Sequence, residues 1–232
     1  SEGRIGITAL GSGSGGNAFV LHCRGYNYLI DAGFSRRELC VRMQMRDIDP
    51  ASIGAIVISH EHGDHVKGCR IFGDEFDIPA YVPCGAADYL RRRDLLPGQV
   101  IEFANDVPFL LPGVRVTPFK VSHDALDPVG FCFESGECKI AVATDLGQLN
   151  LLAVHRLRDA DILVLESNYD QRMLLESKRK IGLKHRIMGS SGHLDNKHAL
   201  EALEELLTAR TRALLLAHVS AECNCRELVA DL

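Results

Sequence analysis

Eight consecutive residues hold most of the side chains in this sequence that could carry out metal chemistry. The run Ile58-Ser59-His60-Glu61-His62-Gly63-Asp64-His65 contains the candidate ligands His60, His62, Asp64 and His65. Neutral imidazole and carboxylate suit Zn²⁺, Mn²⁺ or Fe²⁺. The spacing is too dense for one tetrahedral ion, because the adjacent pair Asp64 and His65 cannot turn toward the same ion as both earlier histidines. The run therefore predicts two metal ions, and a polar surface turn is the alternative.

Apolar segments precede the candidate ligands and are expected to position them. Residues 53–58 read as a buried strand, so the cluster is predicted on the loop between its C-terminal end and a helix near Val66. Three later apolar segments end on further ligand-type residues, namely His123, Asp145 and His218. Each of these alone is typical of a polar strand boundary. Together with the cluster they predict a site held by the ends of rigid strands.

The order of these residues along nearly the whole chain resembles the metallo-β-lactamase fold family. Asp31, in Leu29-Ile30-Asp31-Ala32-Gly33, resembles the first family motif, and the cluster at 60–65 resembles the second. The resemblance implies a four-layer αββα sandwich with a dinuclear metal centre. The implied ligands are His60, His62 and His123 for one ion and Asp64, His65 and His218 for the other, with Asp145 bridging them.

Shorter segments resemble one branch of that family, the YycJ/WalJ branch, which is associated with nuclease activity on DNA. They are Gly11-Ser12-Gly13-Ser14-Gly15-Gly16-Asn17, Asp127-Pro128-Val129-Gly130, Glu166-Ser167-Asn168-Tyr169-Asp170, Gly192-His193-Leu194-Asp195-Asn196 and His218-Val219-Ser220. One segment departs from this branch, because residues 175–182 lack its Gly-Pro-Tyr-Pro-like pattern. The resemblance therefore leaves substrate contacts open.

Residues beyond the metal ligands are expected to act on the substrate. His193 and Glu166 resemble a histidine and a glutamate that phosphodiesterases of the family use around the leaving group. We expect His193 to stabilise the phosphate or deliver a proton, and Glu166 to orient it; a core hydrogen bond is the alternative role. Asp64 is counted with them as catalytic. Asp31 is expected to orient a ligand histidine without binding metal itself.

Basic residues are the candidates for substrate binding. The runs Lys178-Arg179-Lys180 and Lys184-His185-Arg186 lie shortly before the Gly192-His193 motif. From these runs and the last motif, the residues predicted to bind substrate are Lys184, Arg186 and Ser220. A solvated helix face is the alternative for either run.

Hydrolysis is the predicted reaction. Two Zn²⁺ or Mn²⁺ ions, with iron as a further alternative, would share a water and lower its pKa from about 15.7 toward 7, which supplies a metal-bridging hydroxide as nucleophile. The predicted function is a phosphodiesterase that acts as a DNA exonuclease. One alternative is a thioester hydrolase of the glyoxalase II type, for which a glutathione-binding C-terminal helical region is expected. The other is a non-catalytic metal-dependent binding or regulatory protein.

The composition is typical of one enzyme domain over residues 1–232, with 46% hydrophobic and 25% charged residues. The formal net charge of −5 is unusual for a nucleic-acid binder, but two divalent cations would offset most of it and local patches decide phosphate contact. The eight cysteines lack a C-x-x-C pair, which favours reduced thiols. With no apparent signal peptide or membrane-spanning run, we expect a cytoplasmic protein with no membrane partner, and homo-oligomerisation is left open.

The remaining pattern predicts a strand-rich α/β fold. Strands are expected near 4–10, 18–23, 26–30, 53–58, 79–82, 107–111, 114–121, 129–134, 138–143, 161–166 and 211–217. The capping-box spacing of Ser35 and Glu38 predicts a helix that ends near residue 46. Asp195 is expected to cap a second helix, with an apolar face made of Ala199, Leu203, Leu206 and Leu207. Hairpins first and interleaved helices later fit the αββα sandwich.

Overall fold

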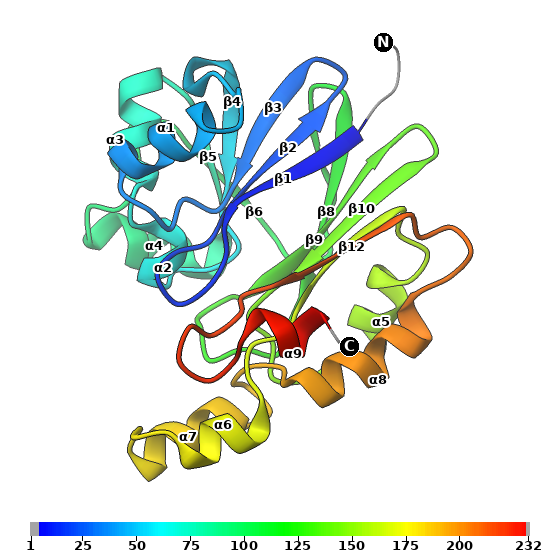
Figure 1. Cartoon of the computed structure of the whole chain (residues 1–232). Coiled ribbons are helices and arrows are strands. Elements are labelled where there is room, and N and C mark those ends of the chain that lie inside the picture. Colours follow the sequence, from blue (N-terminus) through cyan, green and yellow to red (C-terminus); the bar gives the residue numbers. More distant parts are fainter. Residues whose placement is uncertain (1–4, 231–232) are drawn as a thin grey trace.

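Two six-stranded sheets face each other in the computed structural model, which describes residues 5–230 (Figure 1). In spatial order, the first sheet contains β1 (Ile5–Gly11), β2 (Ala18–Cys23), β3 (Tyr26–Ile30), β4 (Ile53–Val57), β5 (Ala80–Pro83) and β6 (Val100–Phe103). The second contains β7 (Phe109–Leu111), β8 (Val114–Lys120), β9 (Val129–Ser135), β10 (Cys138–Ala143), β11 (Ile162–Glu166) and β12 (Ala213–Ala217).

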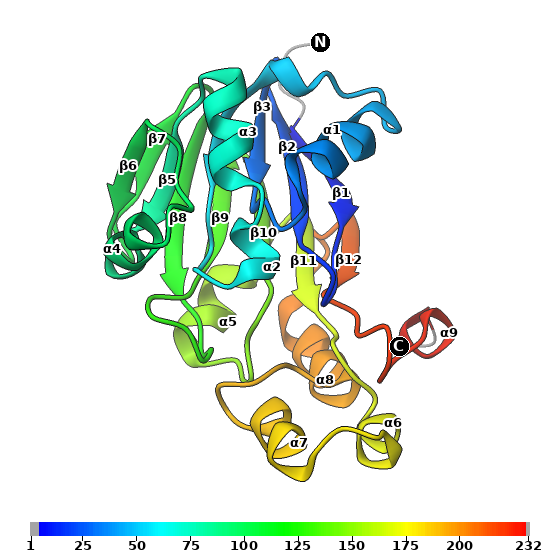
Figure 2. The same ribbon diagram turned by 90° about the vertical axis from the view of Figure 1, so that its left-hand side faces the viewer.

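Helices cover the outer faces of both sheets (Figure 2). The first sheet is accompanied by α1 (Arg36–Gln44), the 3₁₀ turn Pro50–Ser52, α2 (Gly63–Val66), α3 (Cys69–Phe76) and α4 (Cys84–Arg92). The second is accompanied by α5 (Leu151–Leu157) and α8 (Asn196–Leu206). The short helices α6 (Gln171–Glu176), α7 (Ile181–Met188) and α9 (Arg226–Ala230) lie beyond the strand ends (Figure 1). None of the helices in residues 5–230 has the length and apolar character needed to span a bilayer.

Three apolar cores separate four layers. The core under the first sheet's helices joins Val20 to Leu39 of α1 and Phe72 of α3. The core between the sheets includes Phe19 and Leu21. A third core joins the second sheet to α5 and α8. Because side chains alternate across a strand, Val20 faces the helices while Phe19 and Leu21 face the opposite sheet, and β2 is buried on both faces. The predicted αββα sandwich is confirmed.

The strand directions bring distant residues to one edge of the second sheet. Strands β10, β11 and β12 are parallel, and β8 shares their direction because both β8 and β10 pair antiparallel with β9. The C-terminal ends of these strands therefore lie together, just before His123, Asp145 and His218 and at Glu166 itself. In the sequence, the first and the last of these residues are almost one hundred positions apart.

The predicted elements are recovered with a few differences. Ser35 and Glu38 form the expected capping box, and α1 ends at Gln44. Asp195 caps α8, but Leu207 ends that helix and is 39% exposed, so it lies outside the buried face. Strand β6 was not predicted, because it is an edge strand in which only Phe103 is buried. The short helices α3 to α7 were also missed, since helices of this length depend on tertiary packing. Residue 4 of the first predicted strand lies outside the described residues.

Candidate metal centre

The loop that carries the histidine cluster is held by Asp31, the residue after β3. Its carboxylate accepts hydrogen bonds from the backbone N–H of Ser59 at 2.8 Å, the Ser59 hydroxyl at 2.8 Å and Nδ1 of His65 at 2.7 Å. Asp31, Asp145 and His218 all follow strands and have left-handed backbones, with φ of 57°, 57° and 54°. This conformation costs energy for a residue with a Cβ and is concentrated at functional sites. The sharp turns at these positions direct side chains across the strand ends.

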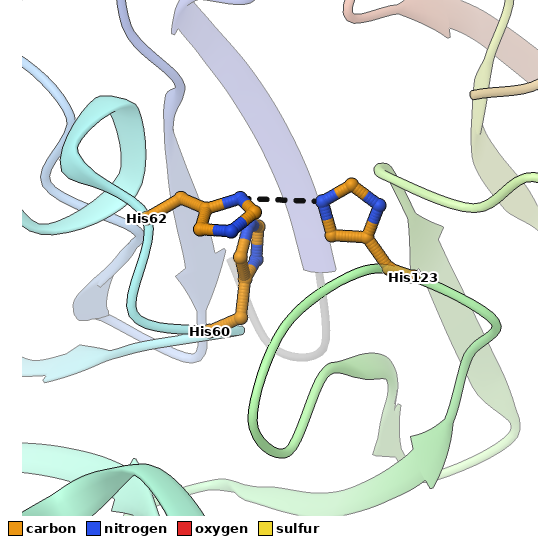
Figure 3. A group of neighbouring side chains, drawn as sticks. All are labelled: His60, His62 and His123. Carbon is orange, nitrogen blue, oxygen red and sulfur yellow. Dashed lines mark hydrogen bonds between the residues drawn. The ribbon is translucent and has the colours of Figure 1, made fainter. Parts of the chain in front are cut away.

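Two sets of candidate ligands converge. The ring nitrogens of His60, His62 and His123 lie within 4.8 Å of one another. These rings come from two loops, and Nδ1 of His62 is 3.3 Å from Nε2 of His123 (Figure 3). The second set is Asp64, His65 and His218, within the same limit. Asp145 is grouped with His60 and His65, and so lies between the two sets. The structure brings together all the predicted ligands; their occupancy by metal stays a prediction.

Three buried atoms support a metal at these positions. Among the residues that the structure describes, Nε2 of His60 and Nε2 of His218 have no hydrogen-bond partner, and Oδ2 of Asp145 has none apart from the ion-pair contact with Nε2 of His65 at 3.1 Å. Buried polar atoms without partners are rare in folded proteins and can indicate an absent ion. One of these atoms belongs to each ligand set and the third to the residue between them. Imidazole and carboxylate donors fit Zn²⁺, Mn²⁺ or Fe²⁺.

The two ligand sets differ in protonation. Burial lowers the pKa of His60 well below its usual value, and it also lowers the pKa of His123. Burial acts in the same direction on His65 and His218, but the carboxylate of Asp145 outweighs it. As a result the pKa of His65 is raised well above its usual value and that of His218 is raised to about 10. Without metal, His60 and His123 are therefore neutral at pH 7, whereas His65 and His218 are charged.

Glu166, the last residue of β11, is fully buried and makes four contacts. Its Oε1 accepts from Nδ1 of His193 at 2.9 Å and from Nδ1 of His218 at 2.6 Å. Its Oε2 accepts from the backbone N–H groups of Leu146 at 2.9 Å and Leu194 at 3.1 Å. The contact with His193 matches the predicted pair. The contact with His218 was not foreseen, because it follows from the pairing of the neighbouring strands β11 and β12.

A cleft of about 440 Å³ opens over the candidate ligands, with Asp64, Asp145 and His193 among its lining residues. Of the basic residues predicted to bind substrate, Arg186 lines this cleft. Lys184 does not: its buried ammonium donates to the backbone carbonyls of Leu175 at 2.6 Å and Ser177 at 2.8 Å.

Ser220, which was also predicted to bind substrate, does not line the cleft. It is buried, and its hydroxyl accepts from the backbone N–H of Cys223 at 3.1 Å, which stabilises the turn after β12. Arg179 lines the cleft but was not singled out from the sequence. It belongs to the run Lys178-Arg179-Lys180, in which all three residues are basic. No local signal therefore shows which of them reaches the cleft.

Asn17 is a second residue that sequence reasoning did not select. It is fully buried, and its Nδ2 donates to Oδ2 of Asp64 at 3.3 Å. Its Oδ1 accepts from the backbone N–H of Gly13 at 2.9 Å and from the hydroxyl of Ser12 at 3.0 Å. Ser12 in turn accepts from the backbone N–H of His218 at 2.7 Å. The glycine-rich loop thus connects two candidate ligands, and the only sequence signal was an asparagine at its end.

Comparisons with known proteins agree with this geometry. The family model of the beta-lactamase superfamily domain matches residues 26–219. Exodeoxyribonuclease YycJ of Bacillus anthracis is 30% identical over 96% of this chain and 85% of its own length. Exodeoxyribonuclease WalJ of Streptococcus pneumoniae serotype 2 is 29% identical over 98% of this chain and 86% of its own length.

Solved structures show the same fold. The metallo-beta-lactamase fold protein YhfI of Bacillus subtilis superposes with a TM-score of 0.74 at 18% identity, over 97% of this chain and 90% of that one. The match to the family model and to near full-length relatives covers every segment that carries a candidate ligand. The chain therefore belongs to the metallo-β-lactamase fold family of metal-dependent hydrolases, in the branch that contains YycJ and WalJ.

Proposed function

We propose that this protein is a dinuclear metal-dependent phosphodiesterase that acts as a DNA exonuclease. The observation that carries the proposal is the pair of ligand sets on either side of Asp145, which open onto one cleft. Two divalent ions bound there would activate water at neutral pH and stabilise charge on a phosphoryl oxygen. The exodeoxyribonuclease names of the near full-length relatives favour DNA as the substrate.

The protein's own residues supply the proton chemistry. His193 is part-buried in the cleft lining, with Nδ1 directed to Glu166. Burial opposes charge on this ring, but the Glu166 carboxylate outweighs burial and raises the pKa of His193. A ring that is protonated near neutral pH can donate its Nε2 proton to the leaving oxygen, while the hydrogen bond to Glu166 keeps the other proton on Nδ1. Asp64 is a candidate metal ligand and also lines the cleft, so it borders the space in which the phosphoryl group would react.

Metal content is the first test. Protein reconstituted with Mn²⁺ or Zn²⁺ should contain two ions per chain by elemental analysis. Asp145→Asn should weaken both ions together, because an amide is a poorer anionic bridge than a carboxylate. A limit of one ion at full activity contradicts the dinuclear proposal, and loss of a single ion from the variant contradicts the bridging role.

Substrate class is the second test. Metal-loaded protein is incubated with end-labelled single- and double-stranded DNA and RNA, and in parallel with a thioester. We expect products released progressively from DNA ends. Turnover of the thioester alone would replace this function by thioester hydrolysis. Absence of turnover on every substrate, with both ions bound, would favour a binding or regulatory role.

The cysteine chemistry supports the proposed cytoplasmic location. The eight cysteines all fall within the described residues, and each is a free thiol there. Burial raises the pKa of Cys132 to about 11, so this thiol resists ionisation and oxidation. Free thiols, four of them buried, are typical of proteins from reducing compartments.

A further inference from the structure

Helix α7 and the segment that precedes it form one wall of the cleft. Segment 171–188, with α6 and α7, stands beyond the strand ends beside the candidate metal centre (Figures 1 and 2). Its residues in the cleft lining are Arg179, Leu183, Arg186 and Ile187. Arg186 and Ile187 lie three and four positions after Leu183 in α7, so each neighbours Leu183 on the same side of the helix. That face is the one turned toward the cleft.

Both arginines are held in place through one nitrogen each. Nε of Arg179 donates to Glu222 at 3.0 Å, and Nε of Arg186 donates to Asp124 at 2.8 Å. Within residues 5–230, these are the side-chain hydrogen bonds that the two guanidinium groups make. A guanidinium carries five N–H donors in a planar fork, so the terminal amino groups stay available for a phosphate. The carboxylates orient the cations without consuming them.

Stability alone gives little reason for this arrangement. The side chains of Arg186 and Asp124 are 62% and 57% exposed, and ion pairs at such exposure contribute about 0–1 kcal/mol to stability. Leu183, between the two arginines in sequence, is 43% exposed instead of packing in a core. An exposed apolar side chain flanked by two partly free cations matches the alternation of base or sugar and phosphate along a nucleic-acid strand.

We propose that Arg179 and Arg186 form a subsite for a phosphate other than the one that is cleaved. Leu183 contacts the nucleoside that lies between these two phosphates. The enzyme then selects substrates with at least two phosphates, either the next link of a strand or a phosphorylated strand end, over isolated phosphodiesters. This inference rests on the proposed phosphodiesterase function. The α7 side of the cleft then selects substrates that have more than one phosphate, and cleavage takes place at the metal centre.

The test compares substrates that differ by one phosphate. Metal-loaded protein is given a dinucleoside monophosphate, the same dinucleotide with an added terminal phosphate, and a trinucleoside diphosphate. The wild type should prefer the two-phosphate substrates in kcat/KM by about tenfold to one-hundredfold, the range expected for one charge-assisted hydrogen bond. The terminal-phosphate and internal-link substrates separate the two sources of the second phosphate.

Substitution of the arginines should remove this preference. Arg179→Gln and Arg186→Gln, singly and together, should lower kcat/KM on the two-phosphate substrates more than on the dinucleoside monophosphate, mainly through KM, so that the gain from the second phosphate is lost. On a longer single-stranded oligonucleotide, the slope of log KM against log salt should fall by about 0.7 for each phosphate that the variant no longer binds. Melting temperature checks that each variant folds.

Two control variants distinguish phosphate binding from other roles. Glu222→Gln removes the carboxylate that holds Arg179 and keeps the cation, so the preference should persist. Arg172→Gln removes an α6 charge whose side chain is 84% exposed and pairs with Glu176 outside the cleft, so it should change nothing.

Separate outcomes overturn the inference and the function on which it rests. A preference that survives both arginine substitutions, or that Glu222→Gln abolishes equally, overturns the subsite. Failure of the wild type to cleave any of the three substrates overturns the phosphodiesterase function instead.

Discussion

The carboxylate of Glu166 accepts a hydrogen bond from Nδ1 of His218, a candidate metal ligand, at 2.6 Å. The same oxygen lies 2.9 Å from Nδ1 of His193, which lines the cleft. A single buried oxygen thus orients one ring toward the proposed metal and another toward the substrate. Hydrogen bonds to the far nitrogen of a ligand histidine hold its tautomer and strengthen it as a ligand. Glu166 is therefore coupled to both the metal centre and the proposed proton donor.

This coupling predicts different effects for two substitutions. His193→Ala should retain both metal ions and lower phosphodiester turnover by about 10²–10⁴, the range for a positioned general acid. Glu166→Gln should in addition lower the affinity for the metal ion at His218 by about 10–100-fold. Metal titration followed by chelator competition measures the ions, and p-nitrophenyl esters, which need little proton donation, should be partly spared by His193→Ala. Equal metal affinity in the two variants would show that the hydrogen bond to His218 does not support the ligand.

The two metal sites should respond differently to pH. His60 and His123 have lowered pKa values, so they are already neutral at pH 7 and their ion should bind with little proton release. The pKa values of His65 and His218 are both raised, that of His218 to about 10, so their ion must displace a proton from each ring, and its affinity should rise by about one-hundredfold per pH unit while both rings are charged. Calorimetry in buffers of different ionisation enthalpy counts the protons released with each ion. Equal proton release for both ions would contradict the assignment.

Asn17 should matter to the metal at Asp64 although it does not belong to either ligand set. Its amide donates to Asp64 and its oxygen is held by the glycine-rich loop. Asn17→Ala removes the hydrogen bond that orients Asp64, and we expect metal affinity at that site to fall by about 10–100-fold. The ion at the site of His60 and His62 serves as the internal control, because Asn17 contacts neither residue. Loss of both ions together would indicate unfolding of the loop and not a local effect.

Gly33 should tolerate no side chain. A Cβ at this position would lie 1.7 Å from the backbone oxygen of Asp64 and 2.5 Å from the backbone nitrogen of Asn17, and backbone atoms cannot move aside. Gly33→Ala is expected to destabilise the fold by at least about 3 kcal/mol, or about 6–12 °C in Tm for a chain of this size. Gly6→Ala is the matched control, because a Cβ there would meet nothing within 4 Å. Similar Tm values for the two variants would contradict this close approach.

Local sequence patterns, with the family resemblance that they carry, predicted the candidate ligands and the fold class. The cluster at 60–65 was readable because its spacing is local, and His123, Asp145 and His218 were readable because apolar strand patterns end just before them. The continuous apolar run of β2 and the helix caps at Ser35 and Asp195 are recognised from neighbours within a few residues. The edge strand β6 was missed because it has only four residues and lacks the regular alternation of buried and exposed side chains.

Only the tertiary structure decided which of these groups meet. Glu166 contacts His218 across 52 positions and Asn17 contacts Asp64 across 47, through strand pairing and loop packing that local patterns do not specify. The same holds for the basic run after α6, where the ammonium of Lys184 is bound to backbone carbonyls while Arg179 and Arg186 reach the cleft. Charge and residue type are properties of the sequence, but the direction of a long side chain is set by the carbonyls and carboxylates that folding brings within its reach.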